Sequence, residues 1–176
     1  MAVRPIRLYP DAVLRRRGRT VERVTKRLAR LAHDMAETMY QANGIGLAAP
    51  QVGEAVRLMV VDVGEGLTTF INPTVLERAG TDVDVEGCLS IPGITGYVER
   101  PAQVTVEALD LEGRPFRVQA EGLYARAIQH EIDHLNGVLF VDRASRIFRE
   151  ERREGEEEPV AVEIDRNELL RLEVAR

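Results

Sequence analysis

Two histidines four residues apart, with a glutamate directly after the first, are the residues of this sequence best suited to chemistry. They lie in QHEIDH (129–134), inside a segment, 123–135, whose apolar spacing predicts a helix. Residues four apart share one face of a helix, so His130 and His134 can bind one cation with their imidazoles. Glu131 would then lie beside the cation, where it can handle the proton of a water molecule.

The predicted helix has a second, apolar face, formed by Tyr124, Ile128, Ile132 and Leu135. If the histidine face lines a site, both faces are buried. A carboxylate beside two imidazoles is costly to bury without a partner, and a bound cation removes that cost. We therefore expect a metal site and not two surface histidines that happen to share a face.

A catalytic metal site usually has three protein ligands and one open position, so a third ligand is required. One candidate is Cys88, the only cysteine of the chain, in EGCLS (86–90). Gly87 permits a close backbone approach there, and the backbone N–H of Leu89 can point into the site. The other candidates are carboxylates downstream of the histidines: Glu150, Glu151 and Glu154. The context of Cys88 favours the thiolate.

A third segment, GIGLAAPQ (44–51), places two glycines among small apolar residues, which permits close packing against a ligand or a helix. It is not a phosphate loop, because the G-K-[ST] ending is absent and no strand leads into a G-x-G-x-x-G. Gln51 offers a side-chain donor at its end.

The elements that must position these motifs follow from periodicity and turn residues. Helices are predicted at 21–41 with Thr20 as N-cap, at 123–135, at 143–153 and at 167–174, and strands at 56–63, 67–71, 103–109, 116–120 and 160–164. The fold class is α+β, with short, mostly antiparallel strands packed around the central helix that carries H-E-x-x-H. His33 lies off the apolar stripe of its helix and is expected at the surface.

Composition narrows the class of protein. The 176 residues fit one domain, with 44% hydrophobic and 30% charged residues. No apolar run approaches the ~20 residues of a membrane helix, and the start lacks a secretory signal, so we expect a cytoplasmic protein without membrane contact. A net charge of -5 argues against specific DNA binding. Basic residues gather at 15–30 and acidic ones at 154–158, and both runs are expected to be solvated surface.

GIGLAAPQ, EGCLS and QHEIDHLNG, in this order, resemble the three signature motifs of the peptide deformylases. The resemblance runs from about Pro5 to about Ser145 and includes the compact spacing of bacterial-type members without an insertion between the first two motifs. It implies a catalytic domain at 1–145 and a C-terminal extension at 146–176. The implied activity is metal-dependent removal of the formyl group from N-terminal N-formylmethionine of nascent polypeptides, with release of formate.

The resemblance also implies roles for individual residues. Metal ligands would be Cys88, His130 and His134. Glu131 would be the general base and then the general acid, and Gln51 with the backbone N–H of Leu89 would stabilise the oxyanion. Substrate contacts would come from Gly44, Ile45, Gly46, Leu123, Arg126 and Ala127. Arg126 is expected to line the pocket with its aliphatic stem while its head reaches solvent.

The implied cofactor is one divalent ion, iron(II) in the family, for which zinc, nickel or cobalt can substitute. The implied partners are N-formylmethionyl nascent peptides and, with them, the ribosome. Two other interpretations fit parts of the pattern. A zinc endopeptidase of the H-E-x-x-H type would use a downstream carboxylate as third ligand, and a non-catalytic module would hold a structural metal with four protein ligands.

Overall fold

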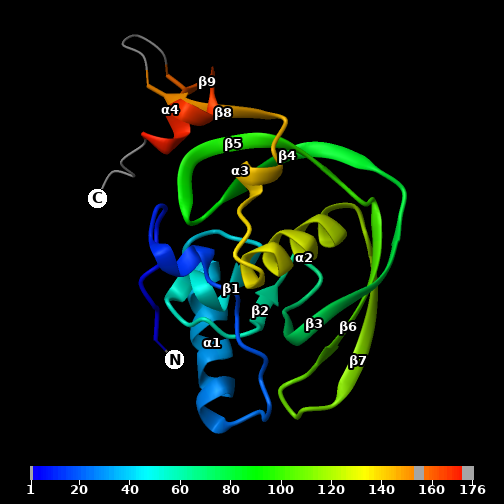
Figure 1. Cartoon of the computed structure of the whole chain (residues 1–176). Coiled ribbons are helices and arrows are strands. Elements are labelled where there is room, and N and C mark those ends of the chain that lie inside the picture. Colours follow the sequence, from blue (N-terminus) through cyan, green and yellow to red (C-terminus); the bar gives the residue numbers. More distant parts are fainter. Residues whose placement is uncertain (1, 153–156, 172–176) are drawn as a thin grey trace.

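The computed structural model describes residues 2–152 and 157–171, and two antiparallel sheets surround one helix in it. Helix α2 lies at the centre of Figure 1, with β1, β2, β6 and β7 against it and with β4 and β5 passing over it. The strand orders are β1-β2-β3-β6-β7 in one sheet and β4-β5-β8-β9 in the other. This arrangement confirms the predicted α+β fold class and its central helix.

The described strands are β1 Gly46–Ala48, β2 Leu58–Val61, β3 Thr68–Ala79, β4 Asp82–Cys88, β5 Ile91–Arg100, β6 Gln103–Leu109, β7 Pro115–Glu121, β8 Arg146–Glu151 and β9 Val160–Ile164. The helices are α1 Lys26–Gln41, α2 Gly122–Leu135, α3 Phe140–Arg143 and α4 Arg166–Leu170, with short 3-10 turns η1 Ala12–Arg15 and η2 Ala49–Val52. The strands predicted at 103–109 and 116–120 are present as β6 and β7, which pair with each other, and the predicted strand at 160–164 is β9.

Helix α2 lies at the centre of the fold because both of its faces are buried. Residues 125–135 are all buried. The predicted apolar stripe, with Ile128 and Leu135 fully buried, packs against Phe70 and Val106 of the five-stranded sheet. Because the histidine face is buried as well, the helix can present polar groups to an interior site without exposing them to bulk water.

Helix α1 begins later than the sequence predicts, at Lys26. Its N-cap is Thr25, whose hydroxyl accepts a hydrogen bond from the N–H of Leu28, and not Thr20. The reason lies in Val21, whose N–H and carbonyl are both bound by the side chain of Asn72 at 2.8 Å. Those two bonds hold the segment before Lys26 in a non-helical path, although Val21 still packs against the core cluster below α1.

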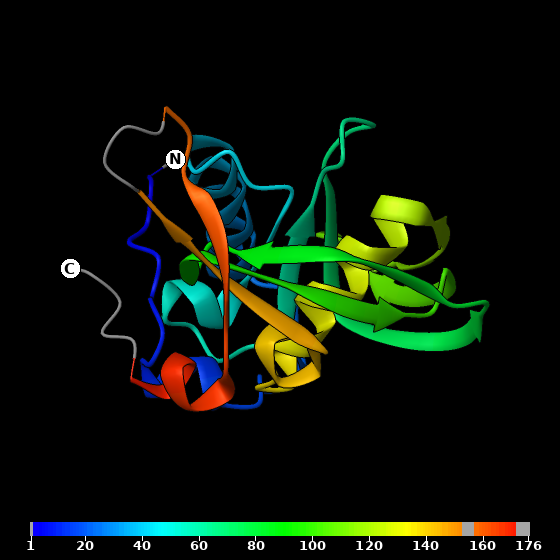
Figure 2. The same ribbon diagram turned by 90° about the horizontal axis from the view of Figure 1, so that it is seen from above.

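The predicted helix at 143–153 is wrong. After the short helix α3, the chain forms strand β8, which pairs with β5 and with β9 (Figure 2). Ile147 is buried between the sheet and α3, whereas Arg146 and Phe148 face the other side of the sheet. The predicted helix at 167–174 corresponds to α4, and residues 172–176 lie outside the described part. The division of the chain at Ser145 stays a prediction.

Strands β4 and β5 are absent from the sequence prediction. In the structure β4 runs through Cys88, and the turn comprises Leu89 and Ser90. Residues 82–85 alternate polar and apolar, but most of β4 is exposed, so this short alternation marks no buried face. The strand predicted at 67–71 continues in the structure as β3 and bends at Asn72, which has a φ of 51°. The pairing with β6 shifts register there, between Ile71 and Thr74.

Candidate active site

Three side chains from two elements form a cluster of metal-ligand type. Cys88, at the end of β4, meets His130 and His134 of α2, and one donor atom of each lies within 4.8 Å of the others. Cys88 Sγ lies 3.3 Å from Nε2 of His134. Among the described residues the third member of this cluster is the cysteine, and neither Glu150 nor Glu151 on β8 belongs to it. Glu154 lies outside the described residues.

The chemistry of this donor set fits a divalent transition metal. One thiolate and two imidazoles suit zinc, iron(II), cobalt or nickel. Burial lowers the pKa of His134 well below its ordinary value, so its imidazole is neutral, as a ligand must be. Burial also opposes the charged form of His130, but hydrogen bonds with Cys88 and Glu86 outweigh it and raise the pKa of this histidine. The site therefore stabilises a positive charge between Cys88 and Glu86.

Glu86 orients His130. Its Oε2 lies 2.8 Å from Nδ1 of His130, which leaves Nε2 as the available donor. Arg100 donates two hydrogen bonds to the same carboxylate and a third, of 2.9 Å, to Asp133. Burial would raise the pKa of Glu86, but hydrogen bonds from Arg100 and His130 more than offset it, so this pKa lies well below its usual range.

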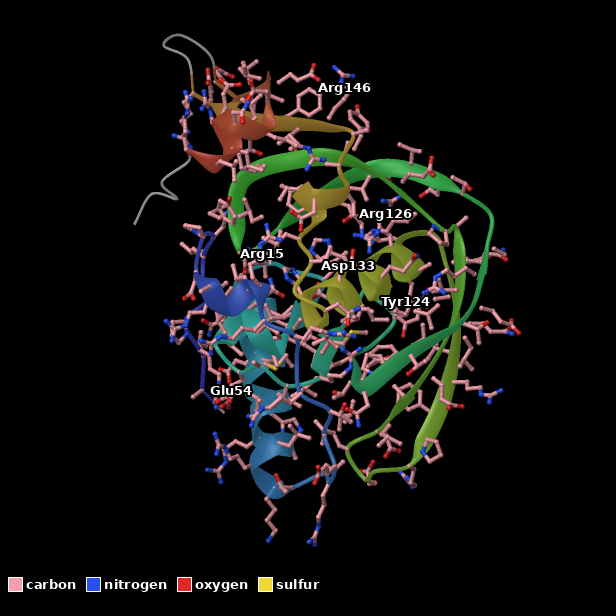
Figure 3. The ribbon with its side chains drawn as sticks, in the orientation of Figure 1. Arg15, Glu54, Tyr124, Arg126, Asp133 and Arg146 are labelled. Carbon is pink, nitrogen blue, oxygen red and sulfur yellow. The ribbon has the colours of Figure 1, made fainter. Side chains whose placement is uncertain are left out.

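Arg126 belongs to the same hydrogen-bond network. The expectation that its guanidinium reaches solvent is wrong. The residue is only 6% exposed. Its guanidinium donates to Glu86 at 2.8 Å, to the carbonyl of Val98 at 2.9 Å and to the carboxylate of Asp82 at 2.8 Å. A buried guanidinium needs such partners, and the β4–β5 ribbon above α2 supplies all of them (Figure 3).

Glu131 is buried beside the ligand cluster, at 4% exposure. Its Oε2 has no hydrogen-bond partner within the described part of the chain. Burial raises the pKa of Glu131 to about 7. Gly46 of β1 makes room for this side chain, because a Cβ at that position would lie 2.4 Å from Oε1 of Glu131. The second glycine of GIGLAAPQ is therefore a packing requirement of the site.

Both ends of the Gln51 side-chain amide form hydrogen bonds. Its Oε1 accepts the backbone N–H of Ala48 at 2.8 Å, which fixes the orientation of the amide. Its Nε2 donates to the hydroxyl of Ser90 at 3.1 Å and lies 3.6 Å from Cys88 Sγ. The Gln51 donor is thus aimed at the region between the metal-ligand cluster and the turn that contains Leu89.

A cavity of about 380 Å³ opens in front of these groups. Three segments wall it: the 43–46 connection, the end of β4 with the start of β5, and α2. Every predicted site residue except His134 lines it, namely Gly44, Ile45, Gly46, Gln51, Cys88, Leu89, Leu123, Arg126, Ala127, His130 and Glu131. Exposed apolar side chains at its rim, Ile45 and Leu123, make the cavity suited to an apolar side chain of a ligand.

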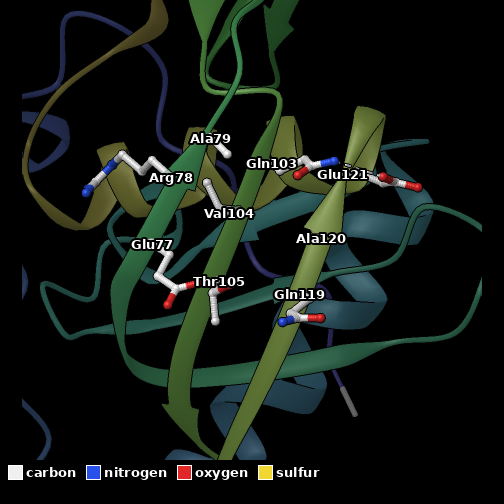
Figure 4. A pocket seen from close by; sticks show the side chains of 9 residues that line it. All are labelled: Glu77, Arg78, Ala79, Gln103, Val104, Thr105, Gln119, Ala120 and Glu121. Atoms are coloured by element: carbon white, nitrogen blue, oxygen red, sulfur yellow. Dashed lines mark hydrogen bonds between the residues drawn. The ribbon is translucent and has the colours of Figure 1, made fainter.

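Another hollow, of about 420 Å³, lies on β3, β6 and β7. Figure 4 shows its lining residues: Glu77, Arg78, Ala79, Gln103, Val104, Thr105, Gln119, Ala120 and Glu121. None of them is a histidine or cysteine, so this hollow holds no part of the cluster described above.

Sequence reasoning missed the supporting residues Glu86, Arg100 and Asp133, and the hydroxyl of Ser90. Glu86, Ser90 and Asp133 lie inside quoted motifs, EGCLS and QHEIDH, so a search for partners of the buried histidines could have found them. Arg100 stands in no motif. His33 is exposed, as predicted.

These features are typical of a metal-dependent hydrolase: a buried H-E-x-x-H helix, a cysteine beside its histidines, an adjoining cavity, and a buried glutamate with one oxygen unpaired among the described residues. A family model described as polypeptide deformylase matches residues 3–150. A peptide deformylase of Caldicellulosiruptor bescii is 54% identical over 151 residues, covering 86% of this chain and 91% of its own. Peptide deformylase 1 of Clostridium acetobutylicum is 59% identical over 143 residues, covering 81% and 95%.

Among solved structures, peptide deformylase from Thermotoga maritima superposes with a TM-score of 0.81 at 44% identity, covering 82% of this chain and 99% of its own. The chain belongs to the polypeptide deformylase family. It is a metal-dependent hydrolase that removes the N-formyl group from nascent peptides. The endopeptidase and the non-catalytic interpretations are therefore set aside. Among the described residues, no helix combines the length and apolarity needed to cross a bilayer.

The close approach of Gly46 to Glu131 predicts that Gly46→Ala displaces the Glu131 carboxylate. We expect turnover to fall by about 10² while bound metal stays near wild type, since a misplacement of about 1 Å can cost that much. Formate release and metal analysis measure the two effects. In a Glu131→Ala background the added methyl has room, so Gly46→Ala should cause almost no further loss there. A second full loss in that background would contradict the assigned contact.

The buried network predicts different effects for its two inner arginines. Arg100→Met should cost roughly 3–5 kcal/mol of unfolding free energy, because both Glu86 and Asp133 lose a buried partner. Arg126→Met should cost less, since one of its two carboxylate partners, Asp82, is partly exposed, whereas both carboxylate partners of Arg100 are buried. Urea unfolding and the rate of metal loss to a chelator should rank the variants in this order. Equal effects would show that Arg126 matters as much as Arg100.

Proposed function

We propose that Glu131, Gln51 and Leu89 carry out the deformylation chemistry on a formyl group bound next to Cys88, His130 and His134. The observation that carries this proposal is the buried Glu131, which has an unpaired oxygen and a pKa of about 7 at the wall of the cavity. A carboxylate with such a pKa can both accept and return a proton near neutral pH.

Cys88, His130 and His134 would hold one divalent ion, which we propose to be iron(II), with zinc, nickel or cobalt as substitutes. Such an ion, when bound, polarises a carbonyl and lowers the pKa of water. The thiolate and imidazole set supports a transition metal, and Glu86 behind His130 supports a fixed ligand orientation.

Glu131 would accept a proton from the attacking water molecule and return it to the nitrogen that leaves as the free amine. The carbonyl oxygen becomes negative during the attack and needs donors placed in advance. Gln51 Nε2 and the backbone N–H of Leu89 would be these donors. The bond from Ala48 to Gln51 Oε1 supports this role, because it keeps the NH₂ end of the amide turned toward Cys88.

The methionine side chain of the substrate would lie in the cavity against Ile45, Leu123, Ala127 and the stem of Arg126. Because the Arg126 head is engaged with Glu86 and Asp82, the wall offers the pocket its methylene groups. The backbones of Gly44 and Gly46 would contact the peptide, since both residues line the cavity and carry no side chain.

We further propose that residues 1–145 contain all the catalytic groups, with 146–176 as an extension, and that the protein acts in the cytoplasm on chains at the ribosome. Exposed basic side chains in the 15–30 segment support contact with ribosomal RNA: Arg16, Arg17, Arg19, Arg23, Lys26 and Arg30. Phosphate contacts of this type weaken with salt.

Glu131→Gln tests the central assignment. Glutamine keeps the shape but cannot accept the proton, so kcat should fall by roughly 10²–10⁴, whereas metal content and melting temperature should stay close to wild type. The measurement is formate release from a formyl-Met tripeptide, with metal analysis of the same sample. A variant with near-normal kcat would mean that another group is the base.

Cys88→Ala tests the ligand set. Loss of one of three ligands should reduce the bound metal to well below one ion per chain after dialysis, because two imidazoles alone hold a divalent ion weakly. Elemental analysis of wild type and variant, loaded with nickel and dialysed together, provides the measurement. Full metal occupancy in the variant would place the third ligand elsewhere.

A further inference from the structure

Apolar side chains continue out of the active-site cavity along β4. The cavity wall includes β4 from Cys88 back to Val85. Val85 is 46% exposed, and Val83, the next residue on the same face of the strand, is 54% exposed. β4 therefore leads from the metal-ligand cluster to the molecular surface, and its outer face stays apolar along that path.

The apolar path crosses from β4 to the strands beside it. Val85 lies opposite Tyr97 of β5, and Tyr97 lies opposite Arg146 of β8. Thr95, which also lines the cavity, lies opposite Phe148. Directly opposed residues point to the same face of an antiparallel sheet. Two rows of side chains thus connect the cavity with the part of the sheet that the C-terminal extension supplies.

The far end of these rows is a fixed aromatic cluster. The rings of Tyr97 and Phe148 meet edge to face, with centroids 5.8 Å apart. The guanidinium of Arg146 lies 5.9 Å from the Tyr97 ring and 5.0 Å from the Phe148 ring. Glu163 of β9 accepts two hydrogen bonds from Arg146, at 3.0 and 2.8 Å. Figure 3 shows Arg146 on the side of β8 that faces away from α2.

We propose that this exit surface, formed by Val83, Val85, Tyr97, Arg146 and Phe148, binds the part of the formyl peptide that follows the residues held in the cavity. The inference rests on the proposed function, because it takes the cavity as the site of the formyl-Met end. The substrate is the start of a longer chain, so the chain must leave the cavity. The apolar rows that begin at Val85 and Thr95 are continuous with the cavity wall.

The dimensions agree with a short stretch of peptide. From β4 across β5 to β8 is about 10 Å, because neighbouring strands lie about 4.8 Å apart. An extended chain advances about 3.3 Å per residue, so about three residues cross the surface. The favoured sequence is apolar: Val83, Val85, Tyr97 and Phe148 are uncharged, and Arg146 is paired with Glu163. The exposed Glu99, opposite Val83, marks the charged edge of this surface. The extension thus acquires a role in substrate selection through β8 and β9.

The test compares peptides of two lengths and two compositions. The probes are formyl-Met-Ala-Ser, an octapeptide that continues with valine and leucine, and a matched octapeptide that continues with serine and asparagine. For wild type we expect kcat/KM to be about tenfold higher for the apolar octapeptide than for the other two, through KM, as burial of a few apolar side chains allows. Formate release measures all three.

The double variant Val83→Thr, Phe148→Thr should lose this preference and leave kcat/KM for the tripeptide unchanged. Thr is chosen because it favours strands. Leu76→Thr is the matched control: Leu76 is 42% exposed on β3, outside the cavity and the exit surface, and its change should leave the preference intact. Val83→Asp alone, at the exposed edge strand, gives the same readout if the double variant does not fold.

Three results would overturn the proposal: equal kcat/KM for the two octapeptides in wild type, an equal loss for tripeptide and octapeptide in the variants, or the same loss in Leu76→Thr. A dimer seen by light scattering that the double variant dissociates, with peptide preference unchanged, would assign the surface to a second copy and overturn it too. Failure of the proposed function is a separate result, because wild type would then release no formate from the tripeptide.

Discussion

The Glu86 carboxylate is the group on which the arrangement of the site depends. It binds His130 from α2, Arg100 from β5 and Arg126 from α2, although it lies at 5% exposure near the end of an edge strand. A buried carboxylate is tolerated only with such partners. The same bonds that neutralise it fix β4 over α2, and Cys88 is two residues further along β4. The hydrogen bonds of Glu86 therefore determine the position of the Cys88 sulfur relative to the histidines.

The five-stranded sheet forms the opposite wall of the site. A second constraint is how closely this sheet approaches α2. Gly46 lies so near Glu131 that no side chain fits between them. The backbone of β1 and the η2 turn can then bring Gln51 to 3.6 Å from Cys88. One sheet thus contributes the thiolate and the other the amide donor. The helix between them contributes the imidazoles and the base, so neither sheet alone contains the site.

Sequence reasoning succeeded where one helix contains both a clear apolar periodicity and the metal-binding motif. The 123–135 helix has an apolar stripe and a histidine face, and both are buried as expected. It failed where a contact distant in sequence decides the structure, as when Asn72 holds Val21 out of α1. At 143–153 the structure has a strand in which Ile147 is buried while Arg146, on the other face, lies over Tyr97 and Phe148. This alternation of faces becomes visible only once the pairing with β5 is known. The resemblance supplied the predicted site residues, whereas Arg100, which stands in no motif and binds both Glu86 and Asp133, needed coordinates.

Charge balance explains why the site accepts a divalent ion. The supporting network contains three carboxylates, on Asp82, Glu86 and Asp133, and three guanidiniums, on Arg100, Arg126 and Arg143, so it is neutral by itself. On the cavity side, the proposed ligand Cys88 as a thiolate and Glu131 as a carboxylate would add two negative charges, which one divalent cation would balance. The low-dielectric interior makes any unbalanced charge expensive. Because the charges of this network already cancel, an ion bound by Cys88, His130 and His134 would have to be balanced by the groups on the cavity side alone.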